Sequence, residues 1–175
     1  CAVSMIVPTP DRKLSIDFTV PYYYGETVGL AQKDSAYAAA KSVAELRGAR
    51  VTSMLNTLWY TEQIDRLPNV EKLPALENVP ALVVALQSGK ADMILLDRPT
   101  AEAIVIANPD LRILPFSGEG SFNISKEETA CAIALPKGNA ELQKMLESAM
   151  SKISKSDVDE MIRDACRNQP LTKLP

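Results

Sequence analysis

Short apolar or β-branched runs alternate along the chain with stretches whose apolar residues recur every three or four positions. The runs predict strands at residues 2–7, 27–32, 50–54, 70–73, 92–96, 111–115 and 129–135. The periodic stretches predict helices at residues 43–47, 57–66, 80–87, 99–107, 140–153 and 156–168. This alternation is typical of βαβ units around a mainly parallel sheet, so the chain is predicted to belong to the α/β class.

Residues near the predicted helix ends have matching local chemistry. Asn56, Asn78 and Asn139 each precede a predicted helix, where an asparagine side-chain oxygen can cap the first free N–H groups. After Asn139 the apolar residues recur at intervals of three and four, at Leu142, Met145, Leu146, Ala149, Met150 and Ile153. This stripe predicts a helix with one face packed against a hydrophobic core.

Composition narrows the kinds of partner. The 175 residues include 19 Lys and Arg against 22 Asp and Glu, a formal charge of −3, and they contain no long basic run. Electrostatic attraction to phosphates is therefore lacking, and no nucleic-acid partner is expected. The longest apolar runs, residues 79–86 and 101–107, are much shorter than the roughly 20 residues that a membrane-spanning helix needs.

The chain contains no histidine, the usual general base and the commonest metal ligand of proteins. Ser-His and Cys-His nucleophile pairs are excluded, and we predict no catalytic residue, no metal and no cofactor. Cys1, Cys131 and Cys166 are too widely spaced for a zinc knuckle. Cys131 and Cys166 either form a disulfide in an oxidising compartment or remain two buried thiols.

Four segments, in the order given, carry a family pattern: SMIVPTPDRKLSIDFTVPYYYG (4–25), RGARVTSMLNTLWY (47–60), ALVVALQSGKADMILLDRPTA (81–101), and a strand, a Pro-Lys-Gly turn and a long helix (130–154). Together they resemble the type 2 periplasmic amino-acid-binding proteins of the polar amino-acid family, which serve ATP-binding-cassette importers. The resemblance covers nearly the whole chain.

The resemblance implies a two-lobed α/β fold that captures a free, polar L-amino acid between its lobes and delivers it to the membrane permease of an ATP-driven importer. It places residues 1–24 and 126–175 in the first lobe and residues 25–125 in the second, with a hinge near residues 24–27 and 123–130. It also implies an extracytoplasmic location, in the periplasm or at the cell surface, with a lipid anchor or a fusion to a membrane protein left open. The chain is expected to be a receptor component and not an enzyme.

The chain departs from the family pattern at several points. Family members usually place further strands and a helix before the first segment, so the first lobe is expected to be incomplete at its N-terminus. Its apolar helical stripe is then expected to self-associate or bind apolar dyes unless a preceding segment, a partner copy or a second chain covers it. Val7 stands where a hydroxyl residue is common, and Asn56 where glycine is common.

A free amino acid brings a carboxylate and an ammonium, which call for hydrogen-bond donors and an acceptor. The resemblance assigns the α-carboxylate to Arg12, in the setting Thr9-x-x-Arg12, because a guanidinium can grip a carboxylate through two parallel hydrogen bonds. It assigns the α-ammonium to Asp97, which ends an apolar strand at the edge where open α/β sheets bind ligands. Capping the following helix is the alternative role of Asp97. Asp92, at the other end of this strand, resembles a structural residue.

Asn56, Thr57 and Leu58 follow a predicted strand and open a helix, so their backbone N–H groups are expected to face the ligand carboxylate, with Thr57 the strongest candidate. Ser4 and Val7 are expected to contribute backbone groups from the first lobe. Two other functions stay open: a sensor or effector-binding domain, and a dehydratase-like enzyme on the same fold. The enzyme would need a second acid or base beside Asp97.

Overall fold

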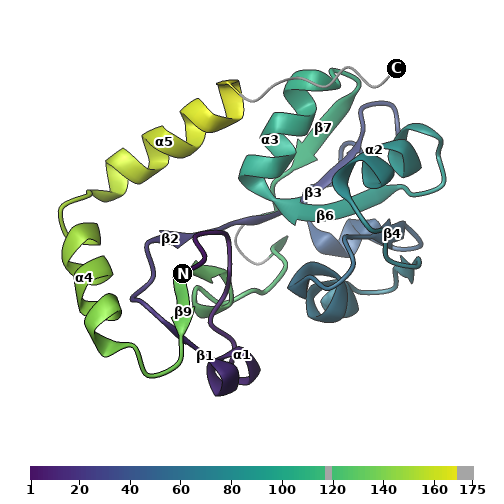
Figure 1. Ribbon diagram of the computed structural model, residues 1–175. Helices are drawn as coiled ribbons and strands as arrows, with labels where there is room; N and C mark the ends of the chain where they lie inside the picture. The colour runs from purple at the N-terminus through teal and green to yellow at the C-terminus, as the bar shows by residue number, and fades with distance from the viewer. Residues whose placement is uncertain (117–119, 169–175) are drawn as a thin grey trace. The chain divides into compact units, whose positions relative to one another are not determined.

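The computed structural model describes residues 1–116 and 120–168 and divides them into two compact units (Figure 1). Unit 1 comprises Cys1–Glu26 and Ser125–Asn168, and unit 2 comprises Thr27–Ile124. The chain enters unit 2 after Glu26 and returns to unit 1 after Ile124. The last part of the predicted first lobe, residues 169–175, lies outside the described residues.

Unit 2 is built on a five-stranded sheet in the order β5-β4-β6-β3-β7. Its strands are β3 (Thr27–Gln32), β4 (Arg50–Thr52), β5 (Glu71–Lys72), β6 (Met93–Asp97) and β7 (Leu111–Leu114). β5, β4 and β6 pair in parallel, whereas β3 pairs antiparallel with both β6 and β7. The α/β class is confirmed. The prediction of a mainly parallel sheet is wrong around β3, because hydrophobic periodicity reports burial and not strand direction.

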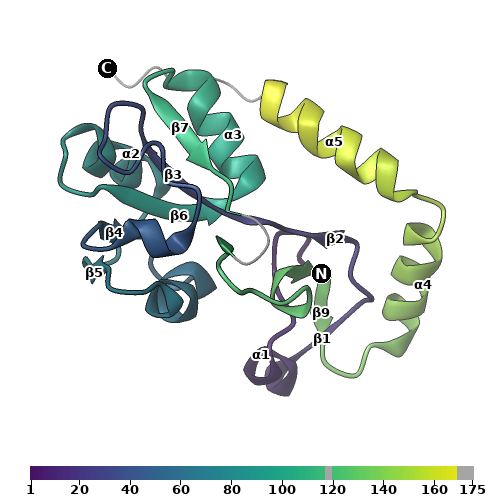
Figure 2. The same cartoon turned by 180° about the vertical axis from the view of Figure 1, so that it is seen from behind.

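Helical segments cover both faces of this sheet (Figures 1 and 2). An apolar cluster lies on each face, because successive side chains of a strand point to opposite faces. Helices α2 (Val79–Gln87) and α3 (Arg98–Ala107) pack on one face, against side chains that include Leu30, Ile94 and Leu96. The 3-10 turn η1 (Val43–Leu46), the π-helix η2 (Trp59–Gln63) and the 3-10 turn η3 (Ile64–Arg66) pack on the other, against Ala31, Met93 and Leu95. The predicted helix at residues 57–66 is thus replaced by a π-helix and a 3-10 turn.

Unit 1 contains two antiparallel ribbons, three α-helices and a short 3-10 turn within its described residues. β1 (Ile16–Phe18) pairs with β9 (Ala134–Pro136), and β2 (Tyr23–Tyr24) pairs with β8 (Ala130–Cys131). The α-helices are α1 (Pro10–Ser15), α4 (Ala140–Met150) and α5 (Lys155–Asn168), and the turn η5 (Glu127–Thr129) precedes β8.

The strand predicted at residues 2–7 is not formed. Ala2 exchanges two hydrogen bonds with Ala134, of 2.8 and 3.0 Å, and the Ile6 carbonyl accepts the Ala132 N–H at 3.0 Å. The segment is bent where the Ile6 N–H donates to the Ser4 carbonyl at 2.8 Å. The strand predicted at residues 129–135 is likewise divided into β8 and β9.

Helices α4 and α5 form as predicted but contain no buried residue, so the core face expected from residues 142–153 is a wrong prediction. Met145 on α4 is 64% exposed and Met161 on α5 is 57% exposed. The described part of unit 1 offers only two-stranded ribbons as a packing surface. Periodicity identified the helices, but it cannot report whether a partner surface exists.

The local caps and cysteines give mixed outcomes. Asn78 and Asn139 cap α2 and α4 as predicted, through hydrogen bonds of 3.0 and 3.1 Å. Of the two alternatives for Cys131 and Cys166, the structure has thiols: Cys131 is buried and donates to the Thr129 carbonyl at 3.5 Å, whereas Cys166 is only half-buried. Within the described ranges no helix is both long enough and apolar enough to cross a membrane.

Candidate functional site

One edge of the unit 2 sheet gathers four of the residues predicted from the sequence. β4 and β6 are parallel neighbours, with Thr52 opposite Ile94, so their carboxyl ends meet at the same edge. Asp97 is the last residue of β6, and the turn containing Asn56, Thr57 and Leu58 follows β4. Carboxyl edges of this kind are where open α/β sheets bind ligands.

Asp97 caps helix α3, as the alternative role predicted. Its Oδ1 accepts the Thr100 N–H at 2.9 Å, and its Oδ2 accepts the Thr100 hydroxyl at 2.8 Å. The side chain is only 5% exposed, and Asp97 is the sole buried charged residue in the described part of the chain. It forms no ion pair with a described residue. An ionised carboxylate has about four acceptor positions, so the contacts with Thr100 leave acceptor capacity unused.

The turn after β4 has a conformation that the sequence did not reveal. Asn56 has a φ of 61°, in the left-handed region that glycine and asparagine adopt most readily, so Asn56 is not the predicted helix cap. The Thr57 hydroxyl donates to the Met54 carbonyl at 2.6 Å and closes the turn. Within the described residues the N–H groups of Thr57 and Leu58 make no backbone hydrogen bond, and they precede η2.

In unit 1, Arg12 is the third residue of the short helix α1, an element that was not predicted from the sequence. The Thr9 hydroxyl accepts the Arg12 N–H at 3.4 Å, so the Thr9-x-x-Arg12 spacing is that of a helix cap. The Arg12 Nη1 donates to the Val7 carbonyl at 3.0 Å, which brings Arg12 and Val7 together. One donor of the guanidinium fork is therefore already engaged.

Ser4 and Val7 were expected to contribute backbone groups to the site, and their carbonyl groups already have partners within unit 1. The Ser4 carbonyl accepts the Tyr22 hydroxyl at 2.7 Å, and the Val7 carbonyl accepts the Thr9 N–H at 2.9 Å in addition to Arg12. Burial, reinforced by the neighbouring Cys131, raises the pKa of Tyr22 above its usual value. The phenol therefore stays protonated and keeps donating to Ser4.

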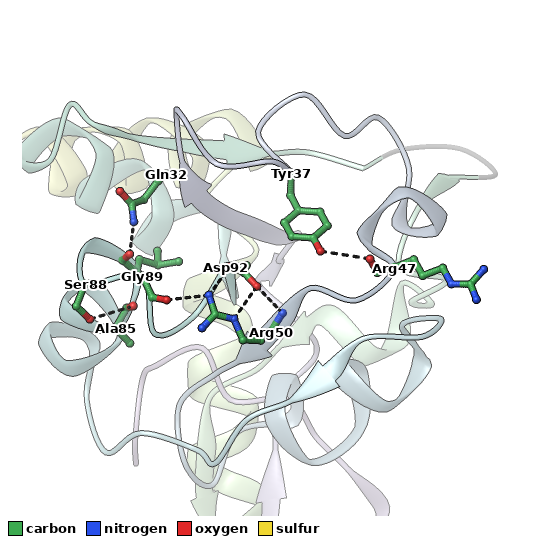
Figure 3. Close-up of polar contacts among 9 residues, drawn as sticks. Gln32, Tyr37, Arg47, Arg50, Ala85, Ser88, Gly89 and Asp92 are labelled. Carbon is green, nitrogen blue, oxygen red and sulfur yellow. Dashed lines mark hydrogen bonds and ion pairs between the residues drawn. The ribbon is translucent and has the colours of Figure 1, made fainter.

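The opposite edge of the unit 2 sheet is held by a charged cluster that includes Asp92 (Figure 3). Arg50 contacts Asp92 through two side-chain donors at 2.7 and 3.0 Å, and its N–H donates to the same carboxylate at 2.8 Å. The hydrogen bond from the Arg50 side chain holds the pKa of Asp92 below its usual value, against the effect of burial. Arg50 also donates to the Gly89 carbonyl at 2.8 Å. Asp92 is thus a structural residue, joining β4 to the start of β6.

A groove of about 510 Å³ lies on unit 1, and none of the residues predicted for the site is among those that line it. Its lining includes Lys13, Asp17, Phe18, Tyr24 and Lys137. Lys137 contacts Asp17 at 3.0 Å, and the Gly138 N–H donates to the same carboxylate at 2.7 Å. The Gly138 hydrogen bond, together with Lys137, lowers the pKa of Asp17. No cluster of three or more potential metal ligands occurs in residues 1–116 and 120–168.

Sequence reasoning missed two polar residues at the Asp97 edge. Thr100 holds both carboxylate oxygens of Asp97, and the Asp-x-x-Thr spacing around the helix start was the available signal. Thr27 lies directly opposite Asp97 in the pairing of β3 with β6. The sequence carried no signal for that register.

Comparison with known proteins gives a consistent result. Residues 1–164 match the model of the bacterial extracellular solute-binding proteins, family 3. The ABC transporter arginine-binding protein 1 of Escherichia coli is 27% identical over 157 residues, which are 89% of this chain and 61% of that protein. The chain spans 41% to 61% of the length of the curated relatives it matches.

Solved structures agree with this result. An amino acid ABC transporter substrate-binding protein of Streptococcus pneumoniae, bound to L-arginine, is 27% identical with a TM-score of 0.77, over 94% of this chain and 66% of that one. The holo form of ArgBP from T. maritima is 26% identical with a TM-score of 0.69, over 89% of this chain and 65% of that one. The similarity therefore extends over both described units.

Proposed function

Because the chain belongs to the bacterial extracellular solute-binding proteins, family 3, we propose that it binds a free L-amino acid as the extracytoplasmic receptor component of an ATP-driven importer. The family resemblance of the four sequence segments and the type 2 periplasmic-binding-protein fold are confirmed by the same comparisons. The proposed partner that receives the ligand is the membrane permease of the importer.

The observation that carries the proposal is the buried, unpaired negative charge of Asp97. Buried charges in proteins are normally paired, because the cost of removing a lone carboxylate from water is high. Asp97 is 5% exposed and is contacted by the neutral Thr100, with no Lys or Arg partner among the described residues. An ammonium group of a ligand would supply the missing countercharge at the edge where such sheets bind ligands.

The roles of the other predicted site residues are proposed from the hydrogen-bond donors in the turn after β4 and in helix α1. The N–H groups of Thr57 and Leu58, beside Asn56, are oriented by the turn after β4 and are proposed to donate to the ligand carboxylate. Arg12 is proposed to bind the α-carboxylate through the donors that Val7 does not occupy. Ser4 and Val7 are proposed to act through their backbone, chiefly by supporting the segment that leads to Arg12.

The ligand class is proposed from chemistry and from the relatives. A zwitterion supplies an ammonium for the acidic acceptor and a carboxylate for the set of donors, and neither an ordinary sugar nor a nucleotide carries this pair of charged groups. L-arginine is the first ligand to test, because it is the one named for the Streptococcus pneumoniae structure and because the Escherichia coli relatives are named as arginine-binding proteins. L-histidine is the second, from the name of the Campylobacter jejuni relative. No catalytic role is proposed for any residue.

A thermal unfolding screen tests the proposal. Twenty free L-amino acids, a set of sugars and a set of nucleotides are each added to the purified chain at 1,000 times an assumed micromolar Kd, which would stabilise the native state by about 4 kcal/mol. A rise in Tm with at least one polar L-amino acid supports the proposal. Stabilisation by sugars or nucleotides alone would contradict it.

A further inference from the structure

A buried hydrogen bond joins two side chains that lie far apart in the sequence. The Thr27 hydroxyl donates to the Gln63 Oε1 at 2.9 Å, and the two residues are 7% and 3% exposed. Thr27 is the first residue of β3, and Gln63 is the last residue of the π-helix η2. The bond therefore ties the helical segment to the sheet at one defined position.

That position is beside Asp97. Thr27 and Asp97 are directly opposite in the antiparallel pairing of β3 with β6, and such pairs have side chains on the same face, with Cβ atoms about 5 Å apart. The alternation along β6 gives the same answer independently. Met93 and Leu95, which share a face with Asp97, pack in the cluster that contains Ile64, the residue after Gln63.

The segment tied down by this bond is also unusual in geometry. η2 is a π-helix, a rare form that occurs mostly as single turns and is frequent at functional sites. It follows directly on the turn of Thr57 and Leu58 and contains Trp59 and Tyr60, which are half-buried. A polar bond inside an otherwise apolar layer gives the segment a specific position that packing alone does not define.

We propose that Gln63 is a positioning residue for the amino-acid site: through its hydrogen bond with Thr27, it fixes the segment from Thr57 to Gln63 against the strand position opposite Asp97. The inference rests on the proposed function. It adds that the distance from the Thr57 and Leu58 N–H groups to the Asp97 carboxylate is set by this buried pair. Losing the pair lets the segment shift and weakens ligand binding, while the apolar layer around Ile64 keeps unit 2 folded.

The test is a double-mutant cycle on the full chain with L-arginine, or the amino acid that the thermal screen selects, as the probe. Thr27→Val removes the hydroxyl and keeps the shape, Gln63→Met removes the acceptor and keeps the length, and Thr27→Ser retains the hydroxyl. The Kd is measured by calorimetry, and the urea midpoint is measured for every variant. We expect Thr27→Val, Gln63→Met and the double variant each to weaken binding by about tenfold. The effects of the two single substitutions are then not additive, and the coupling between them has the size typical of contacting residues. Thr27→Ser should bind within about threefold of the wild type.

A matched control lies at the other end of the same strand. Gln32, the last residue of β3, donates to the Leu86 carbonyl near the Arg50–Asp92 cluster (Figure 3). Gln32→Met should lower the urea midpoint without changing the Kd. If Thr27→Val and Gln63→Met fold and bind as tightly as the wild type, the positioning role is wrong and the proposed function stands. If the wild-type chain binds no L-amino acid, the proposed function is wrong and the inference fails with it.

Discussion

Thr27 and Asp97 face each other across the antiparallel pairing of β3 and β6, at the edge of the sheet where β4 also ends. The Thr27 hydroxyl donates a hydrogen bond to Gln63, and the Asp97 carboxylate accepts two hydrogen bonds from Thr100. One buried carboxylate thus has a neutral polar residue as its hydrogen-bond donor and another directly opposite it in the sheet. Asp97 has a structural role, as the cap of helix α3, and it also carries a charge. A substitution that keeps the cap and removes the charge tests the two separately.

Asp97→Asn should abolish most ligand affinity and leave the fold intact. Asparagine caps helices about as well as aspartate, so the contact with Thr100 survives. The lost charge should cost about 2–5 kcal/mol of binding, which is roughly 30-fold or more in Kd. Calorimetric titration with the amino acid identified by the thermal screen measures the effect. Thr100→Val is the matched control, because it weakens the cap and keeps the charge; equal affinity in Asp97→Asn and the wild type would remove Asp97 from the site.

Arg12→Ala should weaken binding by a similar factor, and Arg12→Lys should weaken it less. Lysine keeps a positive charge but lacks the planar fork that grips a carboxylate at two points. Lys13→Ala on the same helix serves as the control, because its exposed side chain is adjacent in sequence and equal in charge. The account of Arg12 is wrong if Lys13→Ala and Arg12→Ala have the same Kd.

Asp92→Asn should destabilise unit 2 in a pH-dependent way without affecting ligand binding. Arg50 depresses the folded pKa of Asp92 below 3.8, so the stabilisation is fully present above about pH 4 and is lost as pH falls through the folded value. The difference in urea unfolding midpoint between the wild type and Asp92→Asn, measured from pH 7 to pH 2.5, should therefore be largest near neutral pH and shrink as the pH falls below 3.8. A constant difference over this range would show that Arg50 and Asp92 are not coupled as described.

The exposed apolar faces of α4 and α5 should make the chain associate or bind apolar dyes. Met145 and Met161 are 64% and 57% exposed, and neither helix has a buried residue. The double variant Met145→Gln, Met161→Gln should lower dye fluorescence and the sedimentation-measured association constant. Val84→Gln and Ile106→Gln, which alter residues of similar exposure in unit 2, form the matched control. A wild-type chain that stays monomeric and dye-free at high concentration would contradict this prediction.

The sequence predicted best those elements whose burial is continuous. Residues 27–32 were predicted as a strand and form β3 with the same bounds, since five of its six residues are buried and read as one apolar run. Helices α2 and α3 begin one residue before their predicted starts, because Asn78 and Asp97 supply local caps that the sequence displays. Local chemistry and burial were sufficient for these elements.

Other features depend on partners distant in the chain. The segment at residues 2–7 has strand-like composition, but its hydrogen bonds depend on where residues 132–134 return. The reversed direction of β3 and the Thr27–Gln63 bond, which spans 36 positions, have no local signal. Arg12 was predicted as a site residue from a spacing that in the structure is a helix cap, so its ligand role depends on the family resemblance.

Calorimetric titration of the unmodified chain with L-arginine, L-histidine and their D-enantiomers is the most direct test of the central claim, that this chain is an amino-acid receptor. The account predicts saturable, one-to-one binding of at least one L-form. It also predicts much weaker binding of the matching D-form, because once the ammonium and the carboxylate are both held, the opposite hand at the α-carbon points the side chain away from the position that the L-form side chain occupies. The absence of saturable heat with every L-amino acid, in a chain shown to be folded by its urea transition, would contradict the account.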